Sequence, residues 1–176
     1  MTDNQNLNSQ VKLLSWMLDD VRKETLRGIE GLNKEQLFMP PVEGEFPIGA
    51  YLMHLGEVDA YWYSIISGKQ MSDEIKRRVY YDAWFDTKPE KYAPPKEPLE
   101  LDEYIEAITE ARDIVKHYMR SLNDGDLDEI VIIQKDSGGG KERMRKWVIY
   151  HLIEHEAHHR GQMFLLIRKA GFRENK

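Results

Sequence analysis

The chain has 176 residues, of which 32% are charged, and its formal net charge is −6. A single domain of this length can bury a hydrophobic core without disulfide bonds, so we expect one domain over residues 1–176. The absence of cysteine excludes a disulfide framework, a thiolate metal site and a cysteine nucleophile. The acidic balance argues against a dedicated nucleic-acid-binding protein, because such proteins bind phosphate with basic surfaces.

The first ten residues, MTDNQNLNSQ, are polar and show none of the basic and apolar regions of a signal peptide. No apolar run approaches the roughly 20 residues that a membrane-spanning helix needs. The sequence therefore predicts a cytoplasmic protein that has no membrane partner and no nucleic-acid partner.

Apolar residues spaced three or four apart predict a first long helix over residues 7–30. Asn33 and Gln36 form a capping signal for a short helical turn, and the Pro/Gly-rich stretch PPVEGEFP follows as a linker. A second long helix is predicted over residues 47–67, with proline in its first turn and Gly68 at its end.

Residues 69–98 are predicted to form a long irregular crossover, because four prolines lie between positions 89 and 98. Aromatic residues between positions 80 and 92 suggest that this segment lies over the domain. A third helix is expected over residues 99–122, and the β-branched run EIVIIQ indicates a short strand. The stretch SGGGK closes that strand, either as a small hairpin or as an extended segment before a last helix over residues 141–169.

The expected fold class is all-α: a four-helix bundle with a long crossover between helices 2 and 3 and a short extended segment before the last helix. The stretch KERMRK places four basic residues at the expected start of the last helix, where the helix dipole favours acids. It is either a mouth for an anionic substrate or a solvated end that pairs with acidic neighbours.

Four of the six histidines lie within nine residues of HLIEHEAHHRGQ, residues 151–162. His155 and His159 are four residues apart, so they share one helix face at the spacing of two imidazoles that bind one metal ion. His151 lies one turn before His155, and His158 borders the same face. Several imidazoles on an inward face need polar partners, which either a shared metal ion or ordinary hydrogen bonds would supply.

His54 is the single histidine of the second helix and lies on its apolar face. Opposite a helix that carries an H-x-x-x-H pair, it becomes a candidate third ligand. His117 differs, because it aligns with acidic residues of the third helix and is expected to be solvated.

The string HEAHH also fits H-E-x-x-H, the pattern of zinc peptidases. That class needs a third ligand, usually downstream, but only 17 residues follow His159 and none of them is a histidine. Gln162 and Leu165 stand where an extended peptidase motif requires glycine and histidine. A zinc peptidase is therefore the weakest hypothesis, and Glu156 is expected on the helix surface, paired with Arg160.

The stretches MHLGEVDAYW, HEAHHRGQ and LLIRKAG together resemble the DinB/YfiT-like family of metal-dependent four-helix bundles, and the resemblance covers nearly the whole chain. It implies a divalent metal ion bound by three histidines, with open positions for water or substrate. By motif position the ligands are His54, His155 and His159. It also implies a homodimer formed through helices, and some relatives are transferases or isomerases that use low-molecular-weight thiols.

Four more residues are candidates to support the metal ligands or to face a substrate: His151, His158, Gln162 and Tyr61. Their alternative role is structural hydrogen bonding along the same helix faces. No residue can be assigned as a catalytic group. Imidazole ligands suit several metals, so Zn, Ni and Fe all remain candidates.

Three classes of function remain open. The leading one is a metal-dependent transferase or hydrolase that acts on a small molecule, with a low-molecular-weight thiol as one candidate substrate. The second is a metal-binding or small-molecule-binding helical dimer without catalysis, and the third is a purely structural dimer. A homodimer is also favoured by the last helix, which is apolar on two faces; the second face contains Ile149, Ile153, Phe164 and Ile167.

Overall fold

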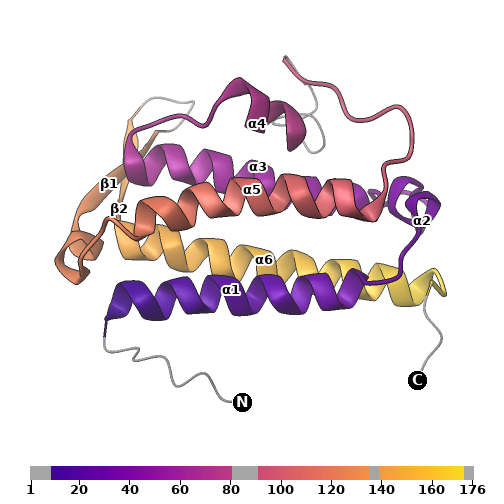
Figure 1. The fold of residues 1–176 in the computed structure, drawn as a ribbon, viewed down its shortest axis with the longest axis horizontal. Coiled ribbons are helices and arrows are strands. Elements are labelled where there is room, and N and C mark those ends of the chain that lie inside the picture. The colour runs from indigo at the N-terminus through magenta and orange to yellow at the C-terminus, as the bar shows by residue number, and fades with distance from the viewer. Residues whose placement is uncertain (1–8, 81–90, 135–138, 173–176) are drawn as a thin grey trace.

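The computed structural model describes residues 9–80, 91–134 and 139–172. Four long helices build a bundle: α1 (Gln10–Ile29), α3 (Ile48–Ser67), α5 (Leu101–Met119) and α6 (Arg145–Lys169) (Figure 1). The predicted all-α four-helix bundle is thereby confirmed, and each helix lies within a few residues of its expected range.

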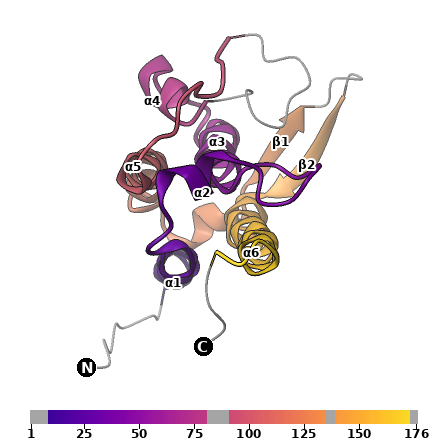
Figure 2. The same ribbon diagram turned by 90° about the vertical axis from the view of Figure 1, so that its right-hand side faces the viewer.

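Viewed along their axes, the four helices lie at the corners of a square in the order α1, α5, α3, α6 (Figure 2). The Tyr118 hydroxyl at the end of α5 donates to the Ile66 carbonyl at the end of α3, so these two helices are parallel. The Arg145 side chain at the start of α6 donates to the same carbonyl, so α6 runs antiparallel to α3. The parallel α3–α5 pair explains why a long crossover is needed between them.

Short elements connect the long helices. Helix α2 (Lys34–Phe38) begins at Asn33, and the side chains of Asn33 and Gln36 each accept a hydrogen bond from the other's backbone N–H, as predicted. Helix α4 (Asp73–Arg78) lies within the crossover, and the 3-10 helix η1 (Asp124–Asp128) follows α5. In the crossover, Tyr92 is buried and Tyr80 half-buried, whereas Tyr81, Trp84 and Phe85 lie outside the described residues.

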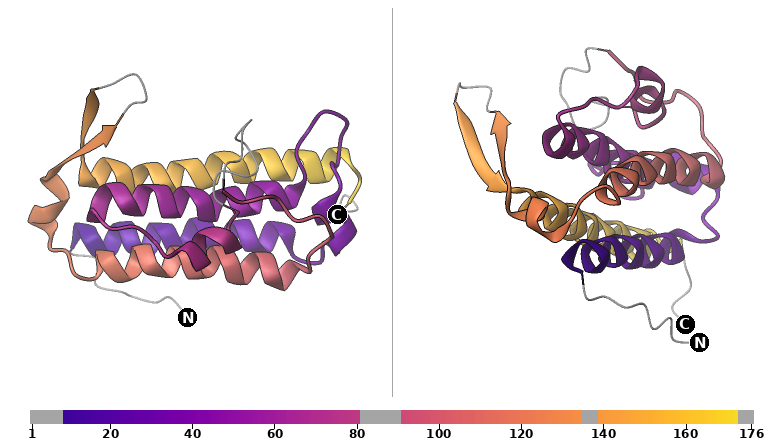
Figure 3. Two further views of the ribbon diagram at one scale, coloured as in Figure 1. Left: turned by 90° about the horizontal axis from the view of Figure 1, so that it is seen from above. Right: turned by 60° about the vertical axis from the view of Figure 1, so that its left-hand side comes forward.

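The expected start of the last helix is wrong by four residues. Strand β1 (Ile130–Gln134) pairs with strand β2 (Gly140–Met144) in an antiparallel hairpin, with Ile130 opposite Met144. The hairpin projects from one end of the bundle (Figure 3). Residues 141–144 pair with β1 through backbone hydrogen bonds, and α6 begins only at Arg145.

This correction leaves two of the four basic residues, Arg145 and Lys146, at the helix start. Lys141 and Arg143 belong to the hairpin, and Arg145 is buried, donating to backbone carbonyls and pairing with Glu129 at 2.9 Å. Lys146 pairs with Asp128. The ion pairs of Arg145 and Lys146 support the interpretation in which KERMRK pairs with acidic neighbours, rather than the anion-binding mouth, although Arg145 is buried and not solvated.

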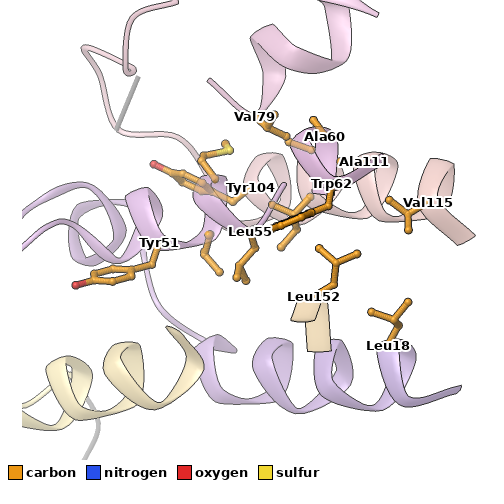
Figure 4. Close-up of a cluster of buried hydrophobic side chains, with 14 of the residues drawn as sticks. Leu18, Tyr51, Leu55, Ala60, Trp62, Val79, Tyr104, Ala111, Val115 and Leu152 are labelled. Atoms are coloured by element: carbon orange, nitrogen blue, oxygen red, sulfur yellow. The ribbon is translucent and has the colours of Figure 1, made fainter. Parts of the chain in front are cut away.

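The core fills the space between the four long helices. Figure 4 shows part of it, where Leu18 of α1, Leu55 of α3, Val115 of α5 and Leu152 of α6 point toward one another. All four of these side chains are buried. Ile149 and Ile167 also lie in this core, and Phe164 packs against it, so the second apolar face of the last helix packs within the bundle.

Gly49 lets α3 approach α5 closely. A Cβ atom at this position would lie 2.6 Å from the ring of Tyr104, which is fully buried and cannot move aside. We expect Gly49→Ala to destabilise the fold by about 1–3 kcal/mol through overpacking.

Gly161 of α6 is the matched control, because a Cβ atom there meets nothing within 4 Å. Gly161→Ala should be neutral or stabilising, up to about 1 kcal/mol, since alanine favours the helix. Urea unfolding of both variants measures the difference, and equal effects would show that the α3–α5 contact does not depend on Gly49.

Candidate metal centre

Two neighbouring antiparallel helices bring three histidines together. His54 projects from α3, and His155 and His159 project from successive turns of α6. One ring nitrogen of each lies within 4.8 Å of the others, and the Nε2 atoms of His155 and His159 are 3.1 Å apart. The structure thus joins residues that are about a hundred positions apart in the sequence.

Hydrogen bonds orient two of these rings. Nδ1 of His54 lies 2.9 Å from a carboxylate oxygen of Glu57, and Nδ1 of His159 lies 2.6 Å from the side-chain oxygen of Gln162. Because both partners are acceptors, each Nδ1 carries the proton, and each Nε2 is then the ring nitrogen that can donate a lone pair to a metal ion. Protein metal sites commonly hold their histidine ligands in this way.

The two α6 histidines are neutral at pH 7. Burial, and after it the neighbouring histidines with His159 first, together lower the pKa of His155 to about 3. Burial likewise lowers the pKa of His159 to about 4, with His54 contributing. Neutral imidazoles are the form that binds metal ions.

The donor set fits a divalent cation. Two nitrogens that each lie about 2.1 Å from a tetrahedral ion are roughly 3.4 Å apart, close to the 3.1 Å between His155 and His159. Three ligands leave at least one coordination position for water or substrate. The cluster can therefore hold a metal ion with small side-chain adjustments.

Other predicted residues lie around this cluster. The ring of His151 is 5.8 Å from that of His155 and stacks on Trp147 at 5.0 Å, while Trp62 of α3 meets it edge-on at 5.1 Å. Gln162 contacts a candidate ligand directly. The ring of His158 is 5.3 Å from that of His159, but its side chain is exposed.

Tyr61 is partly exposed and packs against Trp62 at 5.1 Å. Two further neighbours of the cluster were not predicted as site residues from the sequence. Tyr51 is buried, and its ring lies 5.7 Å from that of His159. Glu57 forms a hydrogen bond with His54. The spacing of Glu57, three residues after His54 on a helix, is a signal that could have found it.

The expected surface position of Glu156 is wrong. Its side chain is 1% exposed and accepts from Arg22 at 2.8 Å and from Arg112 at 2.9 Å, on the side of α6 that faces the bundle. Burial alone would raise the pKa of Glu156, but the two guanidinium groups outweigh it and hold the pKa below its ordinary value. Glu156 is therefore a core carboxylate, and H-E-x-x-H does not provide a catalytic base here.

We expect the metal-free protein to lose stability as pH falls. His155 and His159 have pKa values of about 3 and 4 when folded and 6.5 in the unfolded chain. Between these limits the unfolded chain binds more protons, so their contribution is present above pH 6.5 and lost as pH falls toward 4. Thermal unfolding at pH 7 and pH 5, with chelator present, measures this loss. His155→Ala should show a shallower pH dependence, and an unchanged one would refute the assignment.

Among the described residues, no helix combines the length and the apolar character needed to cross a membrane.

Fold and site together define the class: a four-helix bundle that contains both parallel and antiparallel helix pairs, with a three-histidine cluster between two of its helices. The model of the DinB superfamily matches residues 17–163, and the chain belongs to that family. None of the curated proteins matches the chain.

Solved structures share this fold. A conserved protein from Enterococcus faecalis is similar with a TM-score of 0.70 and 13% identity, over 94% of this chain and 99% of the other. A DinB-like protein from Bacillus cereus has a TM-score of 0.62 and 21% identity, over 90% of each chain. YfiT from Bacillus subtilis, described as a probable metal-dependent hydrolase with an unusual four-helix-bundle topology, has a TM-score of 0.60 and 14% identity, over 97% of this chain and 93% of YfiT.

Proposed function

We propose that the chain binds one divalent metal ion through His54, His155 and His159 and acts as a metal-dependent enzyme on a small molecule. The three-histidine cluster, with its donor atoms within 4.8 Å of one another, carries the proposal. The description of YfiT as a probable metal-dependent hydrolase supports it, because YfiT has the same fold. We also propose a cytoplasmic location.

A divalent ion held by the three neutral imidazoles of His54, His155 and His159 would keep its charge and would, as a Lewis acid, lower the pKa of a bound water or thiol. The chain supplies no thiol, because it has no cysteine, so a thiol would come from the substrate. Glu57 and Gln162 hold the Nδ1 protons of two ligands and fix the direction of their Nε2 atoms. Zn, Ni and Fe all suit these ligands.

His151 and Tyr61 are proposed to face the substrate. Both side chains are partly exposed, and the ring of His151 is 5.8 Å from that of the ligand His155. An imidazole at this place can form a hydrogen bond with a bound substrate. The exposed side chain of His158 is proposed to lie at the rim of the same site.

Metal-loaded protein, incubated with a panel of small esters, amides and alkyl or aryl electrophiles, tests this function. Metal-dependent turnover without added thiol would define a hydrolase, and turnover only with low-molecular-weight thiols would define a transferase. His155→Ala is the matched control and should abolish either activity. Tight metal binding without turnover on any compound would support the alternative, a non-catalytic binding module.

We further propose that the protein is a homodimer, formed through a different surface from the one expected. Exposed apolar side chains of α1, the hairpin and α6 line a groove of about 800 Å³, with Leu13, Ile130, Met144 and Tyr150 among them. Contiguous exposed apolar patches of this kind commonly bind a protein partner. A second copy of the chain is the proposed occupant.

The double variant Leu13→Glu with Tyr150→Glu should dissociate this dimer. Both side chains are more than a third exposed, so the charges should break the interface and leave the fold intact. Leu165→Glu is the control, because Leu165 is equally exposed on α6 but lies outside the groove. Sedimentation should show dimers for wild type and control and monomers for the double variant. A monomeric wild type at micromolar concentration would refute the proposal.

A further inference from the structure

A closed ring of four charged side chains occupies the centre of the bundle, and each long helix supplies one of them. Arg22 of α1 pairs with Glu156 of α6 at 2.8 Å, and Glu156 pairs with Arg112 of α5 at 2.9 Å. Arg112 Nε lies 3.0 and 2.9 Å from the two carboxylate oxygens of Asp59 of α3. Asp59 lies 3.5 Å from Arg22, which closes the ring.

The ring joins helices that are diagonal to each other as well as neighbours. Arg112 reaches from α5 to Glu156 on α6, and Arg22 reaches from α1 to Asp59 on α3, across the square of helices seen in Figure 2. The two arginines also donate to carbonyls of each other's helices, Arg22 to Ile108 at 3.0 Å and Arg112 to Leu18 at 3.4 Å. These contacts tie all four helices to one point.

Stability alone does not account for this ring. Two positive and two negative side chains lose their hydration in the core, and well-packed apolar residues often give equal or greater stability than a buried ionic network. Apolar contacts, however, permit small slides and rotations of packed helices. Charged groups with fixed hydrogen-bond directions permit far fewer, because each displaced partner would leave a buried charge unpaired.

The metal ligands are sensitive to such slides. Glu156 directly follows His155 on α6, and Asp59 lies five residues after His54 on α3. Metal–nitrogen distances vary by only about 0.2 Å, whereas a slide by one helical residue moves a side chain by about 1.5 Å. The ring therefore fixes α3 and α6 relative to each other next to the point where their histidines must meet.

We infer that Arg22, Asp59, Arg112 and Glu156 are positioning residues for the three-histidine site. They hold α3 and α6 in the register that brings His54 to His155 and His159, without touching the ion. This inference rests on the proposed metal binding. It gives the glutamate of H-E-x-x-H a role on the face of α6 adjacent to that of the histidines, roughly 60–100° round the helix from them.

Two variants test the inference. Glu156→Gln removes one charge with little change of shape, and Arg112→Lys keeps the charge but loses the fork that donates to both carboxylates. Each should weaken Co²⁺ affinity about 10–100-fold, as is typical when groups that orient metal ligands are lost. Each should also change the visible absorption spectrum of bound Co²⁺, which reports the ligand geometry. The Co²⁺ titrations are carried out below the melting temperature of every variant, so that all of the variants are folded.

Met119→Ala is the matched control, because Met119 is a fully buried residue of α5, about two helical turns after Arg112, and takes no part in the ion pairs of the ring. It should lose stability yet keep Co²⁺ affinity within about threefold and an unchanged spectrum. Wild-type affinity and spectrum in both ring variants would overturn the inference and leave the proposed function intact. If wild type itself binds no Co²⁺, the proposed function fails. Crystal structures of the metal-free proteins then decide the inference: an unchanged His54–His155 separation in Glu156→Gln overturns it.

Discussion

Replacing His155 by alanine is expected to reduce the metal content of the purified protein from about one ion per chain to almost none. Two imidazoles would remain, and the removed ring is that of the candidate ligand His155, whose Nε2 lies 3.1 Å from that of His159. Protein prepared without a histidine tag and analysed by elemental mass spectrometry gives the stoichiometry. Metal at 100 times its dissociation constant should stabilise the wild type by about 2.7 kcal/mol and raise its melting temperature by roughly 5–10 °C.

His117→Ala is the control for this experiment. His117 is exposed on α5, as the sequence predicted, and forms a hydrogen-bond contact with Arg120 at 3.3 Å rather than with the cluster. It should bind metal like the wild type and show the same thermal shift. Equal metal content in His155→Ala and in the wild type would contradict the assignment of His155 as a metal ligand.

The fold could be predicted because its signals are local. Four amphipathic patterns predict the four long helices. A proline-rich stretch predicts the crossover, and a β-branched run predicts the first strand. The start of α6 could not be predicted in this way. Residues 140–144 form a strand because they pair with residues 130–134, and that pairing is a non-local contact that no helix pattern reveals.

The candidate metal ligands were predicted from the spacing of His155 and His159 and from the family motif around His54, and the structure brings these three histidines together. The position of Glu156 was missed. A polar residue beside a histidine pair is expected on the surface, because charged residues are seldom fully buried. Yet Glu156 follows Leu152 by four residues and precedes Met163 by seven, so it interrupts a buried stripe at helical spacing.

The same signal marks the other members of the ring. Arg22 lies between Leu18 and Ile29 on the buried stripe of α1, and Arg112 lies between Ile108 and Val115 on that of α5. A charge on an apolar stripe is ambiguous in a single helix. Four such charges of balanced sign, one on each helix, would have predicted a buried ionic network. Which helices face each other is the information that the sequence lacks.

Arg112→Met is expected to destabilise the metal-free protein by about 3–5 kcal/mol. Burial alone would lower the pKa of Arg112, but the carboxylates of Asp59 and Glu156 outweigh it and raise the pKa, so this side chain is a cation in the fold. Its loss would leave two carboxylates in the core with Arg22 as their remaining charged partner in the ring. Urea unfolding with chelator present measures the change. A loss below about 1 kcal/mol would show that the ring does not carry buried charges.

Replacing the whole ring separates stability from positioning. Arg22→Met, Asp59→Leu, Arg112→Met and Glu156→Leu together remove every buried charge of the network. Such replacements are often neutral or stabilising, so the quadruple variant should unfold within a few kcal/mol of the wild type. It should nevertheless bind Co²⁺ more weakly, because apolar packing does not fix the register of α3 and α6. A quadruple variant with restored stability and wild-type metal affinity would reduce the ring to a dispensable feature of the core. Restored stability with weakened metal binding would support a ring that positions the histidines rather than one that only stabilises the fold.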